Sequence, residues 1–149
     1  MLLSDNIRSV LDRKGWGVYS VLPSALVYDA VQQMADRDIG ALAVIDANGL
    51  PGIFSERDYA RKIILLGRSS KDTTVREVMS HPARIVGPED SVEDCLRRMT
   101  VYRLRHVVAT VEGRAVGIIS IGDLVNWIMS AQEDTISQLT SYISGDYPG

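Results

Sequence analysis

An internal repeat constrains the fold of this 149-residue chain more than any other feature of its sequence. When the sequence is aligned with itself at an offset of 65 residues, without a gap, apolar residues recur together with proline, glycine and aspartate. The identical pairs are Val21 and Val86, Pro23 and Pro88, Val27 and Val92, Asp29 and Asp94, Met34 and Met99, Gly52 and Gly117, Ile53 and Ile118, Ser55 and Ser120, Asp58 and Asp123, and Ile63 and Ile128. The chain therefore contains two copies of one supersecondary unit.

Each copy has the hydrophobic pattern of a strand, a helix, two strands joined by a turn, and a closing helix. In the first copy the pattern predicts a strand at 18–21, a helix from Pro23-Ser24 to about Asp36, strands at 42–45 and 52–55 around an Asp-Ala-Asn-Gly turn at 46–49, and a helix at about 56–66. In the second it predicts a helix from about Ser91, strands at 106–110 and 115–120 around a Glu112-Gly113 turn, and a closing helix toward Ile143.

The repeat divides the chain into five segments. These are an N-terminal helix in 1–15, the first repeat in 16–66, a polar linker with a short helix in 67–82, the second repeat in 83–130, and a C-terminal helix and tail in 131–149. The linker helix is predicted from Thr74-x-x-Glu77, which has the pattern of a capping box. The N-terminal helix is predicted from Ile7 to Lys14.

Composition and charge argue against several classes of protein. Hydrophobic residues make up 46% and charged residues 23%, as in ordinary globular domains. A net charge of −3 argues against a nucleic-acid partner. Cys95, the single cysteine, excludes an internal disulfide and a cysteine-based zinc site, and we expect it to be buried. With no secretory signal and no apolar run near ~20 residues, we expect a soluble, cytoplasmic protein without a membrane segment.

The sequence shows no arrangement typical of a catalyst. No Ser-His-Asp, Cys-His or paired-carboxylate pattern, no P-loop and no dinucleotide fingerprint is present. His81 precedes Pro82 in the linker and is not part of a metal-ligand spacing in the sequence, so we expect no metal site. We therefore expect neither enzymatic activity nor a catalytic cofactor.

Each copy contains the pattern Gly-apolar-apolar-Ser-x-x-Asp, within GIFSERDYARK at 52–62 and GIISIGDLVNW at 117–127. Together with REVMSHP at 76–82, the doubled unit resembles a pair of cystathionine-β-synthase (CBS) domains over 16–129. The resemblance implies an α/β fold of two tandem β-α-β-β-α repeats, paired through their sheets about a pseudo-two-fold axis, with a parallel pair and a hairpin in each sheet. It also implies clefts between the repeats that bind AMP, ADP, ATP, NAD(H) or S-adenosylmethionine.

The Ser-x-x-Asp elements are the candidate ligand sites. A strand that ends at a helix N-terminus presents backbone N–H groups suited to phosphate. The resemblance implies that Asp58 and Asp123 bind ribose and that Ser55 and Ser120 approach phosphate. The same pattern is also a plain helix cap, with serine as N-cap, and capping and binding do not exclude one another.

The two copies differ in the cations near these elements. Arg57, Arg61 and Lys62 form either a phosphate-binding cluster or a solvated helix face. The second copy lacks them and compensates with Arg103, Arg105 and His106 at its middle strand, where Arg105 and His106 are candidate phosphate contacts. His106 is alternatively a hydrogen-bonded strand-edge residue. The resemblance places the adenine in an apolar slot formed by Val18, Ser20, Ile39, Ala41, Ala83, Ile85, Leu104 and Val107.

These features predict a non-catalytic regulatory module that binds AMP or NAD(H), with ADP and ATP as further candidates. Such a module would sense energy or redox state and act in trans on an unidentified effector protein. The alternative is a constitutive interaction or assembly module whose clefts are empty or vestigial. Apolar helix faces predict a homodimer. The cations of the first copy predict that phosphorylated ligands bind better than S-adenosylmethionine.

Overall fold

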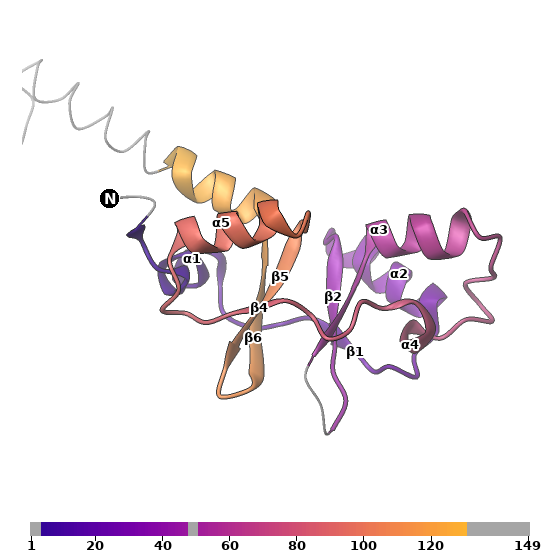
Figure 1. Ribbon diagram of the computed structural model, residues 1–149. Helices are drawn as coiled ribbons and strands as arrows, with labels where there is room; N and C mark the ends of the chain where they lie inside the picture. Colours follow the sequence, from indigo (N-terminus) through magenta and orange to yellow (C-terminus); the bar gives the residue numbers. More distant parts are fainter. Residues whose placement is uncertain (1–3, 48–50, 131–149) are drawn as a thin grey trace, which may run out of the picture.

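The computed structural model describes residues 4–47 and 51–130 of the chain. The Asn48-Gly49 part of the predicted turn lies outside these residues, as do the C-terminal segment 131–149 and the predicted continuation of the last helix. The described residues form two three-stranded sheets that lie side by side, each accompanied by its own helices (Figure 1). The fold is mixed α/β, as predicted.

The elements follow the predicted order of the two copies. They are α1 (Ile7–Lys14), β1 (Ser20–Val21), α2 (Val27–Arg37), β2 (Ala41–Val44), β3 (Gly52–Ser55), α3 (Glu56–Tyr59), the π-helical turn η2 (Ala60–Ile64), α4 (Val75–Val78), β4 (Ile85–Val86), α5 (Val92–Val101), β5 (His106–Val111) and β6 (Arg114–Ser120). Residues 121–130 are helical. The predicted turn at Glu112-Gly113 joins β5 to β6, and both of its residues have positive φ.

The two sheets have the same topology. In the first, β1 and β2 are parallel and β2 and β3 are antiparallel; β4, β5 and β6 repeat this arrangement. The sheets meet through a small core of Ala41 and Ile53 from one copy and Ala83 and Val108 from the other. This pairing of equivalent sheets is the predicted pseudo-two-fold arrangement.

Each repeat completes its core with the helix that precedes the other repeat. Helix α1 buries Ile7 and Leu11 in a cluster with β4, β5, β6 and α5. Helix α4 buries Val75 and Val78 in a cluster with α2, β2 and β3. In Figure 1, α1 accordingly lies beside the second sheet and α4 beside the first.

Both predicted flanking helices are confirmed, and α4 begins where the capping box predicts. The Thr74 N–H donates to Glu77 Oε2 at 2.7 Å, and the Thr74 hydroxyl donates to the same oxygen at 3.0 Å. These hydrogen bonds, chiefly the one from the backbone, lower the pKa of the exposed Glu77 carboxyl.

Helix α2 begins at Val27, later than the predicted Pro23-Ser24. The linker pairs with the chain just before α2: Leu26 forms a β-bridge with Thr74, and the Val75 N–H donates to the Ala25 carbonyl at 2.8 Å. The residues before Val27 are therefore held in a turn and an extended bridge, which a local helical pattern does not reveal. Strand β1 is also shorter than predicted and begins at Ser20, while the Gly17 N–H donates to the Val116 carbonyl of the other copy.

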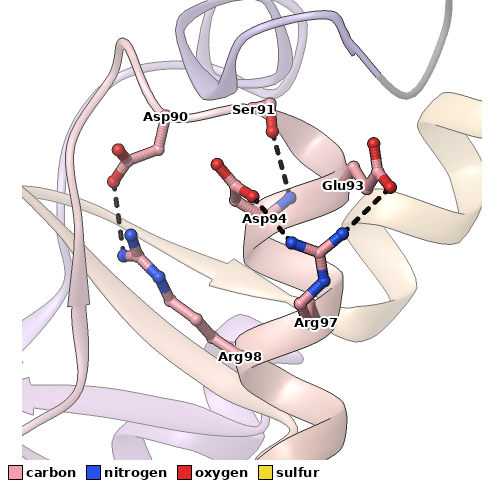
Figure 2. Close-up of polar contacts among 6 residues, drawn as sticks. All are labelled: Asp90, Ser91, Glu93, Asp94, Arg97 and Arg98. Carbon is pink, nitrogen blue, oxygen red and sulfur yellow. Dashed lines mark hydrogen bonds and ion pairs between the residues drawn. The ribbon is translucent and has the colours of Figure 1, made fainter.

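The second copy starts its helix at the predicted place. The Ser91 hydroxyl accepts the Asp94 N–H at 3.0 Å and caps α5. Figure 2 shows this cap, with Arg97 paired to Glu93 and Asp94 on the next turn.

Gly117 permits the close approach of α1 to β6. A Cβ at this position would lie 2.8 Å from Leu11 Cδ2, and the Leu11 side chain is fully buried. Gly52, its equivalent in the first copy, would bring a Cβ within 3.0 Å of Met79 Sδ at the end of α4. The repeated glycine therefore allows α1 and α4 to pack closely against the two sheets.

Two further sequence expectations concern burial and membranes. Cys95 is buried as predicted, and loss of solvation raises the pKa of its thiol to about 11. Among the helices of residues 4–47 and 51–130, none has the length and apolar character needed to span a bilayer.

Candidate functional site

Two clefts open between the repeats, with volumes of about 620 and 590 Å³. The first cleft contains Ser55 and Asp58 together with residues 82–84 and 102–106 of the second copy. The second cleft contains Ser120 and Asp123 together with residues 16–19 and 38–41 of the first copy. Each cleft thus combines the Ser-x-x-Asp element of one copy with the early strands of the other.

Asp58 is held rigidly at the wall of the first cleft, with 8% of its surface exposed. Its Oδ2 accepts the Ser55 N–H at 3.0 Å and the Ser55 hydroxyl at 3.1 Å, while Ser55 Oγ accepts the Asp58 N–H at 3.2 Å. Its Oδ1 lies 3.1 Å from Lys62 Nζ and 3.3 Å from the Ser80 hydroxyl. The pair is therefore a complete capping box, as the capping interpretation predicted.

Asp123 occupies the equivalent place in the second cleft. Its Oδ2 accepts the Ser120 N–H at 2.8 Å, and Ser120 Oγ accepts the Asp123 N–H at 3.0 Å. Lys14 of α1 lies 2.6 Å from the same carboxylate and also donates to the Ile118 carbonyl. Each aspartate has a lysine partner, but from a different part of the fold.

The backbone N–H groups at these helix starts are largely engaged, contrary to the expectation that they face a phosphate. The capping boxes use the N–H groups of Ser55 and Asp58. The Glu56 N–H donates to the Gly40 carbonyl at 3.0 Å, and the Ile121 N–H donates to the Arg105 carbonyl at 2.9 Å. A phosphate in either cleft must therefore be bound mainly by side chains.

Another Ser-x-x-Asp sequence, Ser91 to Asp94, also caps a helix but lies outside both clefts. Its serine caps α5, and its aspartate pairs with Arg97 instead of returning to the Ser91 N–H (Figure 2). The sequence pattern alone therefore indicates a helix cap. The Ser55 and Ser120 elements differ from it in lining a cleft and in the bond that each aspartate accepts from the serine N–H.

The cations gather in one cleft. The first cleft has six arginine and lysine side chains, Arg57, Arg61, Lys62, Arg84, Arg103 and Arg105, against the carboxylates of Glu56 and Asp58. The second cleft has Lys14 against Asp38 and Asp123. The expectation that Arg103 and Arg105 compensate the second copy's own element is wrong, because the packing of the repeats brings them beside Ser55 and Asp58.

Sequence reasoning missed several cleft residues. Arg84 and Tyr102 line the first cleft, with the Arg84 guanidinium 3.9 Å from the centre of the Tyr102 ring. Trp16 and Tyr19 line the second. The internal alignment offers one signal, since Arg84 and Tyr19 are equivalent positions of the two copies.

His106 lies at the junction of the two clefts and lines both. Burial lowers the pKa of its imidazole, and the positive charges of Lys14 and Arg105 lower it further. Asp123 and Asp58 act in the opposite direction. The net shift favours a neutral imidazole between the two aspartates.

The predicted adenine-pocket residues divide into two groups. Those that line a cleft are Val18, Ile39 and Ala41 in the second, and Ala83 and Leu104 in the first. Ser20, Ile85 and Val107 line neither cleft. Val107 is buried in the second core, since alternate residues of a strand point to opposite faces.

No group of three or more histidine, cysteine, aspartate or glutamate side chains within residues 4–47 and 51–130 is arranged to hold a metal ion.

Comparison with known families agrees with the two-fold repetition. The family model described as "CBS domain" matches the chain twice, over residues 8–65 and 75–130. Each match contains one sheet, together with the flanking helix that packs against the other sheet.

Individual proteins that are similar to this chain are also named as CBS-domain proteins. The Arabidopsis thaliana protein named "CBS domain-containing protein CBSX3, mitochondrial" is 39% identical over 126 residues, which cover 81% of this chain and 61% of that relative. Bacillus subtilis "CBS domain-containing protein YhcV" is 32% identical over 133 residues, covering 89% of this chain and 94% of the relative. The solved structure of a protein with CBS domains from Burkholderia ambifaria superposes with a TM-score of 0.80 at 42% identity, covering 85% of this chain and 96% of the other.

Proposed function

This chain belongs to the CBS-domain family, a family of regulatory modules that typically bind adenosine ligands, and on that premise we propose that it binds an adenine nucleotide in its first cleft and reports it to an effector protein. AMP and NAD(H) are the leading candidates, with ADP and ATP as further ones. The single observation that carries the proposal is the buried Asp58 carboxylate at the wall of a cleft rich in cations.

The size and lining of the first cleft suit such a ligand. Its volume of about 620 Å³ falls in the range of small-molecule sites, roughly 300–1,000 Å³. Ala83 and Leu104 supply apolar surface for a base, and Arg57 and Arg61 supply donors for phosphate. Lys62, also predicted as a phosphate contact, already pairs with Asp58 at 3.1 Å and donates to the Val78 carbonyl at 2.9 Å. These groups come from both repeats, so a bound nucleotide would hold the repeats together.

Asp58 has the geometry to accept a ribose diol after a small rearrangement. Two of its four contacts come from the hydroxyls of Ser55 and Ser80, at 3.1 and 3.3 Å. Hydroxyl groups rotate freely, so ribose hydroxyls can replace them while the Ser55 N–H and Lys62 keep the carboxylate in place. Ser55 Oγ is then available to a phosphate oxygen.

The second cleft offers a different environment. Its Ser120 and Asp123 repeat the ribose-binding arrangement, but Asp38 and Asp123 outnumber Lys14 among its charged residues. We expect it to accept a nucleoside more readily than a polyphosphate. Phosphorylated ligands should therefore select the first cleft.

A panel of thermal unfolding measurements tests the proposal. AMP, ADP, ATP, NAD⁺, NADH and S-adenosylmethionine are each added at millimolar concentration to the full chain. A ligand present at 100 times its dissociation constant stabilises the folded state by about 2.7 kcal/mol, so a true ligand raises Tm. If none of the six raises Tm, the nucleotide proposal is wrong.

An assembly module is the second candidate, favoured by exposed apolar side chains. Ile64, Leu65 and Leu66 at the end of η2 are 59%, 77% and 67% exposed. Three consecutive exposed apolar side chains favour contact with another chain. We propose a homodimer through this segment, and a monomeric mass in light scattering at micromolar concentration contradicts it.

A further inference from the structure

We propose that a groove beside the first cleft binds the distal phosphates of a nucleoside polyphosphate whose adenosine end lies in that cleft. The groove, called here the outer groove, is bounded by Arg57, Arg61, Arg103 and Arg105. The inference rests on the proposed function of the first cleft. It extends that function by assigning a site for phosphates beyond the first.

The outer groove is continuous with the first cleft. It has a volume of about 590 Å³, and its four arginines and Glu56 also line the first cleft. Thr100 of α5 lines the groove but not the cleft, so it marks the outer end of the passage. A phosphate chain that starts beside Ser55 can therefore leave the cleft along guanidinium groups.

The guanidinium groups of the groove are available for an anion. In the part of the chain that the structure describes, Arg61, Arg103 and Arg105 form no ion pair, whereas Arg97 and Arg98 on the nearby α5 are each paired with carboxylates (Figure 2). Arg57 uses Nη1 to donate to the Arg103 carbonyl at 2.7 Å, which leaves other donors of its guanidinium.

The charge of the groove favours a polyanion. Four guanidiniums face one carboxylate, Glu56, and like charges gathered in this way repel one another. A chain of phosphates carries several negative charges in a line and pairs with guanidinium groups through two hydrogen bonds each. Arg57 and Arg61 come from the first copy and Arg103 and Arg105 from the second, so such a ligand would bridge the repeats.

The internal repeat shows that the groove is particular to this side of the molecule. The positions equivalent to Arg57 and Arg61 are Gly122 and Asn126, and those equivalent to Arg103 and Arg105 are Asp38 and Gly40. None of these four residues carries a positive charge. A polyphosphate subsite is therefore expected beside the first cleft alone.

The test measures dissociation constants of AMP, ADP, ATP and adenosine tetraphosphate by titration calorimetry on the full chain and on three variants. Thr100→Glu places a carboxylate in the outer groove only, and Thr100→Gln is its uncharged control. Thr100 is an exposed helix residue, so both variants should fold. Arg84→Gln removes a cation that lines the first cleft but not the outer groove.

We expect the wild-type affinity to rise with each added phosphate. Thr100→Glu should lower the affinity for ATP and adenosine tetraphosphate by about tenfold and the affinity for AMP by less than about twofold. Only the longer phosphate chains reach the groove, where the new carboxylate repels them. Thr100→Gln should resemble the wild type. Arg84→Gln should weaken AMP and ATP by similar factors.

Two results would overturn the groove proposal, and only the second would also overturn the proposed nucleotide-binding function. If AMP binds but added phosphates gain nothing, or if Thr100→Glu weakens AMP and ATP equally, the outer groove is not a phosphate subsite and the nucleotide function stands. If no adenine nucleotide binds the wild type, the proposed function and the groove proposal both fail.

Discussion

Arg57 donates a hydrogen bond of 2.7 Å from Nη1 to the carbonyl oxygen of Arg103, and this contact joins the two repeats at the first cleft. Arg103 has a left-handed backbone conformation, with φ of 54°, two residues after the end of α5. Its equivalent, Asp38, has φ of 53° directly after α2. Both copies therefore have a left-handed residue after their first helix. In the second copy, the carbonyl of this residue accepts the hydrogen bond from Arg57.

Replacing either left-handed residue by glycine should stabilise the fold. The left-handed conformation destabilises the folded state by about 1–2 kcal/mol for a residue other than glycine. Glycine removes this strain, but it offsets part of the gain because its unfolded chain has more conformational entropy to lose. We expect Asp38→Gly and Arg103→Gly each to raise the free energy of unfolding in urea by roughly 0.5–1 kcal/mol. Arg103→Gly should also weaken ATP binding, whereas Asp38→Gly should not, so a parallel effect on binding would contradict our assignment of Arg103.

Removal of the Asp58 carboxylate should weaken nucleotide binding. Hydrogen bonds to a charged acceptor contribute about 1.5–3 kcal/mol, which corresponds to roughly 10- to 150-fold in the dissociation constant of AMP for Asp58→Ala. Asp123→Ala should have this effect on a ligand in the second cleft. Asp94→Ala is the matched control, because it removes the aspartate of a Ser-x-x-Asp sequence outside both clefts. A loss of affinity in all three variants would indicate a general effect on the fold.

Charge reversal at Arg61 should distinguish a phosphate contact from a surface residue. Arg61→Glu should lower the affinity for ADP more than the affinity for adenosine. Only ADP carries phosphates, which lose the arginine and are repelled by the new carboxylate. In the wild type, raising the salt concentration should weaken ADP and leave adenosine nearly unchanged, because exposed charges are screened. Calorimetric titrations at two salt concentrations give both comparisons, and equal losses for ADP and adenosine would assign Arg61 a scaffold role.

Because of His106, the protein should have a lower free energy of unfolding at pH 5.5 than at pH 7.5. Its pKa is lowered in the folded state by burial, so below about 6.5 the unfolded chain binds a proton that the folded chain does not. The free energy of unfolding should therefore fall as the pH drops below that value, and level off below the folded-state pKa. His106→Gln should lose less stability than the wild type between pH 7.5 and 5.5 in urea titrations. Identical slopes would show that His106 titrates normally.

The contact between Gly117 and Leu11 should appear in a double-mutant cycle. Gly117→Ala places a Cβ 2.8 Å from Leu11 Cδ2 and should cost about 1–3 kcal/mol of stability through overpacking. Leu11→Ala alone should cost about 2–5 kcal/mol through the cavity that it leaves. The double variant should lose clearly less than the sum, because the smaller side chain accommodates the new Cβ. Strict additivity would mean that the two sites do not meet.

Much of the fold could be predicted from the sequence because its signals are local or repeated. Helix α1, the capping box at Thr74, strand β3 and the cap at Ser55 follow from periodicity and spacing within a few residues. The start of α2 could not be predicted in this way. It depends on Leu26 pairing with Thr74, which lies in the linker far along the chain.

The residues of the candidate site likewise differ in whether a local sequence signal predicts them. Ser55 and Asp58 carry their signal in one short motif and its repeat. The grouping of Arg103 and Arg105 with Arg57 has no local signal, because it arises only when the second copy packs across the first. The sequence therefore gives no indication that Arg103 and Arg105 lie beside Asp58 rather than beside Asp123.

The exchange of α1 and α4 has a consequence for how the chain folds during synthesis. Residues 16–80 contain the first sheet and also α4, so every part of that core leaves the ribosome as one continuous stretch. The second core needs α1, which is synthesised before the first core, together with β6 and the helix at 121–130, which are synthesised after it. Since N-terminal units generally fold as they emerge, the first half should fold early while the amphipathic α1 waits for its partners. Among the described elements, α1 is therefore synthesised before the first core but should pack only after that core has formed.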